Sequence, residues 1–230
     1  LVKGTHTFYV LDKAEGLFTP DYMAFALVAG LILGVAGALF RRGSQWAEKN
    51  KPAGNGILWM MPLAGTLTAV VAIWVPQVMG NGRATAQLSF SSNADLAVIP
   101  ILLLSFGAKA IVTLLTIRSG ASGGVLQPGI ALGASGGAML GILWMQIFHT
   151  NSIGMYALLG ACALLAASQQ APLMAICLVM ELADAPINLF VPIGFAVAVS
   201  AFTASCLGEP LAALRLSKSA EKKVIKANAR

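Results

Sequence analysis

A Gly/Ser-rich run over residues 119–124 leads directly into an apolar segment that starts with Val125, Leu126, Gln127 and Pro128. Glycines let backbone N–H groups come close to a ligand, and proline is favoured in the first turn of a helix. The N–H groups of a helix start have no intrahelical acceptor and carry about half a unit of positive charge. They can bind an anion without a full cation beside it, which suits a conduction site that must also release its ion. On spacing alone, a Gly/Ser-rich loop without a ligand stays open as the alternative.

The rest of the chain must position this helix start in a membrane. Hydrophobic residues make up 57% of the 230 residues and charged residues only 10%, against about a quarter in soluble domains. No Asp, Glu, Lys or Arg occurs over residues 119–180, which is long enough for two or three bilayer crossings of about 20 residues each. The composition therefore predicts a polytopic integral membrane protein, and we expect it in the cell (inner) membrane.

The net charge of +6 comes mainly from two clusters of basic residues outside the apolar runs. The positive-inside rule places both clusters on the cytoplasmic side. They do not line a face with interleaved aromatic residues, so nucleic acid is not an expected partner. The clusters are Arg41, Arg42, Lys49 and Lys51, and then Arg215, Lys218, Lys222, Lys223, Lys226 and Arg230.

Three charge-poor runs in the first half of the chain, 22–40, 52–82 and 95–117, each predict one spanning helix. In the first run Gly30 and Gly34 are four residues apart, so they share a helix face that lets a neighbouring helix come close. The third run contains one charge amid apolar residues, and we expect it to face the protein interior, a cavity or the headgroups. Pairing of this helix with another, or snorkelling of the side chain, is favoured over a role in transport. That charge is Lys109.

Beyond residue 118 the pattern of uninterrupted helices ends. An apolar segment follows Pro128 to about Phe148, and a break at 168–172 separates the runs 153–167 and 173–182. Ten residues give about 15 Å of helix, half the thickness of a hydrocarbon core of about 30 Å. Backbone groups freed at such breaks cannot face lipid, so broken helices indicate a transport site. A last apolar run covers 186–207.

Four short blocks follow one another in this region in a definite order. In order and spacing they resemble the CLC family of chloride channels and chloride/proton antiporters, over residues 22–211. The blocks are 119–128 with 131–133, 164–168 with 171–173, 178–181, and 208–211.

The resemblance implies an all-α fold with broken and re-entrant helices, of which this chain holds the second half of an inverted repeat. It implies a homodimer with one chloride pathway in each subunit, and dimer contacts partly on 173–182 and 186–207. Residues 1–20 would be an extracytoplasmic loop, 21–210 membrane helices, and 211–230 a final helix with a basic cytoplasmic tail. The anion-binding residues it implies are Gly124, Val125, Leu126, Gln127, Pro128 and Ala212, with the Val125 and Leu126 amides at the central anion.

Several positions depart from the family pattern. Arg118 and Gln127 stand where small residues are common, Ser122 stands for proline, and Leu126 stands for the usual phenylalanine. Ala212 falls where many members carry a tyrosine whose hydroxyl donates to the anion, so that donor is absent here. The family's gating and proton-accepting glutamates would precede Leu1, and the chain therefore does not distinguish a channel from an antiporter.

Other functions are less well supported by the sequence. A non-transporting membrane assembly subunit would not need the broken helices, and a secondary transporter of another solute would need a carboxylate in mid-span. Glu181 closes an apolar helix close to Asp184, which favours a helix end over a proton relay. No enzyme, cofactor or metal site is expected: His6 and His149 are isolated, and the three cysteines, without CxxC spacing, are expected to be small core residues.

Overall fold

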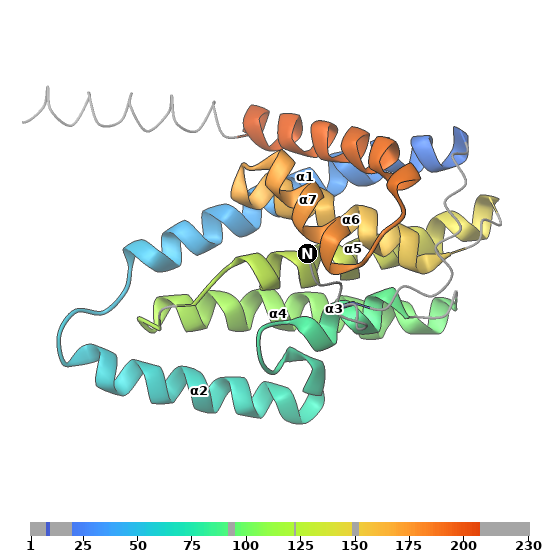
Figure 1. Ribbon diagram of the computed structural model, residues 1–230. Coiled ribbons are helices and arrows are strands. Elements are labelled where there is room, and N and C mark those ends of the chain that lie inside the picture. The colour runs from blue at the N-terminus through green and yellow to red at the C-terminus, as the bar shows by residue number, and fades with distance from the viewer. Residues whose placement is uncertain (1–7, 10–19, 92–94, 122, 149–151, 208–230) are drawn as a thin grey trace, which may run out of the picture.

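The computed structural model describes residues 8–9, 20–91, 95–121, 123–148 and 152–207, and the regular structure in these ranges is helical (Figure 1). Five of the described helical segments are long and apolar enough to cross a membrane, which agrees with the expected all-α membrane fold. In chain order the elements are α1 (Pro20–Lys49), α2 (Gly56–Trp74), η1 (Pro76–Val78), α3 (Arg83–Phe90), η2 (Leu96–Val98), α4 (Ile99–Arg118), α5 (Leu126–Phe148), α6 (Ile153–Gln169), α7 (Pro172–Leu182) and η3 (Ile187–Leu189), which opens the last helical segment, Ile187–Leu207.

The span predicted in the run 52–82 is confirmed as α2, which covers Gly56–Trp74 and not the whole run. Val75 has φ −132° and ψ 76°, because the residue before a proline is disfavoured in the helical region, and α2 therefore stops at Trp74. Gly80 and Gly82 then turn the chain with φ of 69° and 104°, values that favour glycine. The short helix α3 that follows was not predicted.

The centre of the molecule is α6, around which α1, α5 and α7 pack (Figure 1). Every residue over 153–168 is buried, so this helix contacts protein on all sides. Two of its carbonyls accept hydrogen bonds from neighbouring helices: the Tyr22 hydroxyl donates to Met155 O at 2.9 Å, and the Ser200 hydroxyl donates to Ala163 O at 2.7 Å. The most buried helix of the described chain is therefore held by both packing and polar contacts.

The tightest contact in the core is the crossing of α5 and α6. A Cβ atom placed on Gly133 would lie 2.5 Å from the carbonyl oxygen of Gly160 and 2.6 Å from the Cα of Ala161. On the other side of the crossing, a Cβ on Gly160 would lie 2.5 Å from the Cα of Gly137. The two backbones touch directly, as small residues allow in membrane helices.

The predicted glycine face of α1 is confirmed. A Cβ on Gly30 would lie 2.8 Å from the carbonyl oxygen of Ala196, and one on Gly34 would lie 2.9 Å from that of Ser200. Both glycines therefore face the last helical segment, which can pack close to α1 only because neither residue has a side chain.

The predicted break between α6 and α7 is also confirmed. Gln170 caps α6 in the left-handed region with φ 56°, and Pro172 opens α7 at a position where its missing N–H costs nothing. α7 has only 11 residues, too few to cross a hydrocarbon core. Glu181 lies exposed near its C-terminal end, which fits the interpretation as a helix end.

The helix α2 differs from the others because nearly all of its apolar side chains are exposed in this structure. Ala64 and Ala72 are its only buried residues, and α2 lies beside α4 at the edge of the fold (Figure 1). Trp59 and Trp74 near its two ends are each 82% exposed.

We expect Gly133→Ala to lower the free energy of unfolding by about 1–3 kcal/mol, because the added methyl group forces α5 and α6 apart. The matched control is Gly107→Ala in α4, where a Cβ meets no atom within 4 Å. That variant should melt at or slightly above the wild-type temperature, since alanine is the better helix former. Melting curves in detergent test both, and equal melting of Gly133→Ala and wild type would contradict this account of the crossing.

Candidate anion-binding site

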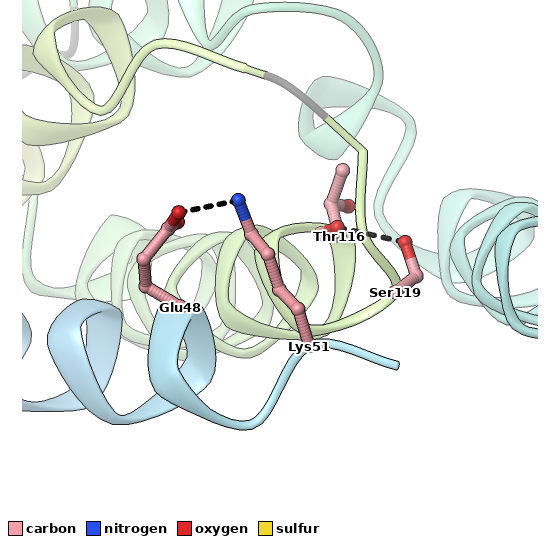
Figure 2. A network of polar contacts seen from close by, with 4 residues as sticks. All are labelled: Glu48, Lys51, Thr116 and Ser119. Carbon is pink, nitrogen blue, oxygen red and sulfur yellow. Dashed lines mark hydrogen bonds and ion pairs between the residues drawn. The ribbon is translucent and has the colours of Figure 1, made fainter. Parts of the chain in front are cut away.

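The segment between α4 and α5 is a turn that its own backbone stabilises. Ser119 donates its N–H to Leu115 O at 2.9 Å and its hydroxyl to Thr116 O at 2.7 Å (Figure 2). Gly120 then reverses the chain with φ 92°, which only glycine adopts without strain. Ser119 and Gly120 thus turn the chain back at the end of α4.

The start of α5 has the geometry that the sequence predicts. The first helical hydrogen bond runs from Gly129 N–H to Val125 O at 3.0 Å, and Pro128 lies in the first turn. Within the described ranges no hydrogen bond leaves the N–H groups of Val125 and Leu126. These two amides are the groups on which an anion site was predicted.

The surroundings of these amides are open. A Cβ on Gly123 or Gly124 would meet no atom within 4 Å, and the Leu126 side chain is 39% exposed. Five of the predicted site residues, which follow one another in the sequence, lie at this helix start: Gly124, Val125, Leu126, Gln127 and Pro128. The sixth, Ala212, lies outside the described residues.

Gln127 makes a contact that the sequence did not indicate. The Tyr9 hydroxyl donates to Gln127 Oε1 at 2.8 Å, across 118 residues of sequence. Tyr9 is fully buried: its N–H donates to Leu182 O at 3.0 Å and its ring lies 5.1 Å from that of Phe90. Residues 1–20 read only as a mixed polar stretch, so nothing in their pattern pointed to this residue.

Lys109 lies in the protein interior, as one of the expected placements allowed, and it does not snorkel. It is 2% exposed, and its ammonium donates to Val78 O at 2.9 Å and to Gly80 O at 2.8 Å. Among the described residues no carboxylate lies within ion-pair distance of it. Lys109 is thus a buried cation that is satisfied by carbonyls and not neutralised by an acid.

The same lysine lies close to the first turns of α5. The point where a Cβ of Gly82 would stand is 3.2 Å from Lys109 Cε, 3.4 Å from Gln127 O and 3.1 Å from Ala131 Cβ. A full positive charge therefore lies near the positive end of the α5 dipole. Both charges would attract an anion near this helix start.

The opposite end of the turn meets the end of α1. The guanidinium of Arg118 lies over the Trp46 ring at 4.9 Å, and Lys51 forms an ion pair with Glu48 at 2.5 Å (Figure 2). Both pairs lie at the surface, so each contributes little stability. Trp46, Glu48 and Lys51 lie in or beside the basic cluster of residues 41–51, which the sequence predicts to be cytoplasmic.

A metal site finds no support in the described part of the chain, where no three His, Cys, Asp or Glu side chains come together. Cys162 is buried, as expected of a small core residue. Cys177 and Cys206 are exposed, which corrects the expectation for these two, because both lie on apolar helices whose outer faces are uncovered here.

We expect Lys109→Met to lower the free energy of unfolding by about 2 kcal/mol, because it leaves the Val78 and Gly80 carbonyls without charged donors. Residues 76–82 should then exchange their backbone hydrogens faster with deuterium. The control Lys51→Met breaks only a surface pair and should change stability by less than about 0.5 kcal/mol. Unchanged exchange over 76–82 in Lys109→Met would show that the lysine does not hold this turn.

Comparison with known proteins agrees with the geometry. Residues 1–205 match the family model of the voltage-gated chloride channels. The chain is 30% identical over 182 residues to the H⁺/Cl⁻ exchange transporter ClcA of Cronobacter sakazakii, an alignment that covers 76% of this chain and 38% of that protein.

Two solved structures share the fold. A slow cyanobacterial Cl⁻/H⁺ antiporter matches with a TM-score of 0.79 and 22% identity, over 94% of this chain and 51% of its own. A CLC-type fluoride/proton antiporter matches with a TM-score of 0.67 and 21% identity, over 86% of this chain and 48% of its own. The chain thus spans about half, or less, of the length of these relatives, and it belongs to the voltage-gated chloride channel (CLC) family.

Proposed function

We propose that the protein carrying this chain transports small monovalent anions, chloride first among them, and that it is not an enzyme. The observation that carries the proposal is the start of α5, where the Val125 and Leu126 amides have no acceptor among the described residues and open glycines precede them. Lys109 adds a buried positive charge nearby without a carboxylate to neutralise it. An anion is the ligand that such an arrangement favours.

Proton coupling is a further part of the proposal that the relatives support. ClcA and both structural relatives are named as exchangers of protons for chloride or fluoride. The carboxylates that would carry protons are not recognisable in this chain, so we propose anion transport first. Whether protons move with the anion is to be measured. A channel and an antiporter differ in whether anion flux moves protons in the opposite direction.

The proposed assembly is a homodimer in the inner membrane. The surfaces implied by the family resemblance, on α7 and on Ile187–Leu207, expose large apolar side chains in the single chain: Leu173 is 73% exposed, Ile187 80% and Phe202 71%. These side chains suit contact with either a second copy or hydrocarbon. Crosslinking in native membranes between engineered cysteines on α7 would separate the two.

The proposal is tested by reconstituting the full-length protein in liposomes and recording chloride efflux together with bath pH. We expect Leu126→Pro to weaken anion binding by about tenfold to a hundredfold, because it removes one N–H while proline is tolerated at the first helical position. The matched control Leu126→Ala keeps the N–H and should transport like wild type. Equal efflux from all three proteins would overturn the amide site.

The same assay separates the alternatives. An assembly subunit would give no efflux of any ion above that of protein-free liposomes. A transporter of another solute would give no chloride efflux but would bind its own substrate, and a chloride-independent thermal shift with small organic solutes would reveal it.

A second test concerns Ala212, which the family resemblance places where a tyrosine hydroxyl usually donates to the anion. We expect Ala212→Tyr to tighten chloride binding several-fold, since one neutral hydrogen bond contributes about 0.5–1.5 kcal/mol. Bound water returns part of that energy in the wild type, so the change should be modest. Isothermal titration measures it, with Ala213→Tyr as the neighbouring control. Equal affinities in Ala212→Tyr and wild type would show that residue 212 does not face the anion.

A further inference from the structure

The side chain of Gln127 has a fixed orientation at the start of α5. Its carbonyl oxygen Oε1 accepts from the Tyr9 hydroxyl at 2.8 Å, so its amino group Nε2 lies on the other branch of the carboxamide. No acceptor in the described ranges takes a hydrogen bond from Nε2, and Nε2 is not among the buried polar atoms that lack a partner. The two N–H donors of Nε2 are therefore accessible, on the residue that follows Leu126 at the start of α5.

The donor that sets this orientation is itself held in place. Tyr9 is fully buried, its N–H donates to the last carbonyl of α7, Leu182 O, and its ring packs edge-on against Phe90. Burial raises the pKa of the Tyr9 hydroxyl to about 12, so the hydroxyl keeps its proton and remains a donor at any physiological pH. Phe8 beside it is covered by Arg83, whose guanidinium lies 4.2 Å above the ring.

The two branches of a carboxamide have opposite effects on an anion. The amino branch donates to it, whereas the carbonyl branch repels it, and the free side chain can turn either branch outward. A hydroxyl that donates to Oε1 favours the amino branch on the open side. Gln127, which stands where the family pattern commonly has a small residue, thus offers an N–H donor that a small side chain lacks.

We propose that Tyr9 is a positioning residue that orients the Gln127 carboxamide so that its amino group, and not its oxygen, serves a small anion at the start of α5. This inference rests on the proposed anion transport and adds to it a side-chain donor specific to this chain. The ligand class is the halide-sized monovalent anion, with chloride and fluoride as the probes.

A double-mutant cycle on the full-length protein tests the proposal. The variants are Tyr9→Phe, which keeps the ring, Gln127→Met, which keeps the length without polar branches, and the two combined. We expect the chloride concentration for half-maximal efflux to rise about threefold in Tyr9→Phe and roughly tenfold in Gln127→Met. The combined variant should match Gln127→Met alone, because Tyr9 acts only through Gln127.

Three results would overturn the proposal while leaving anion transport intact: no change in Tyr9→Phe, no change in Gln127→Met, or additive effects in the combined variant. Melting curves of all variants show whether each one folds. If Tyr9→Phe does not fold, Gln127→Glu replaces it, because the introduced carboxylate still accepts from Tyr9 but carries oxygen on both branches. Chloride affinity in that variant should fall at least as far as in Gln127→Met, and wild-type affinity would overturn the orientation argument.

The proposed function and this inference fail in different ways. If neither the wild type nor Leu126→Pro gives anion efflux above protein-free liposomes, the transport proposal is overturned, and this inference with it. If the wild type transports anions, Leu126→Pro does not, and both Gln127→Met and Tyr9→Phe transport like the wild type, only this inference is overturned.

Discussion

The direct backbone contact between α5 and α6 is the constraint on which the rest of this structure depends. In a bilayer no hydrophobic force drives two apolar helices together, so attraction comes from close packing, and close packing requires small residues. Gly133 and Gly160 let the two backbones touch. With α6 fixed in this way, α1 and the last helical segment attach to it through the Tyr22 and Ser200 hydrogen bonds.

The start of α5 takes its chemistry from its backbone N–H groups. The helix begins after a turn that Ser119 and Gly120 start, and its first N–H groups have no intrahelical acceptor. The N–H groups of Ser119 and Gly120 bond back to α4, whereas those of Val125 and Leu126 have no acceptor among the described residues. Pro128 has no N–H to add, which confines the available donors to the residues just before it.

The sequence predicted the elements that depend on local rules and missed those that depend on distant contacts. The glycine pair in α1, the break before Pro172 and the start of α5 follow from residue chemistry that acts within a few positions. α3 has only eight residues and no long apolar run, so the sequence did not predict it. A helix this short is stable only when it packs against other elements. Tyr9 meets Gln127 across 118 residues, and no local pattern reports such a contact.

Lys109 also bears on how the chain enters the bilayer during synthesis. On the translocon scale a lysine at the centre of an inserting helix costs about 2.5–3.5 kcal/mol. Its two acceptors, the Val78 and Gly80 carbonyls, lie 31 and 29 residues earlier in the sequence, so they leave the ribosome before α4 does. α4 can then enter the membrane against a partner that is already made. The contacts between Lys109 and residues 78–80 thus join α4 to the end of α2 as one helical hairpin.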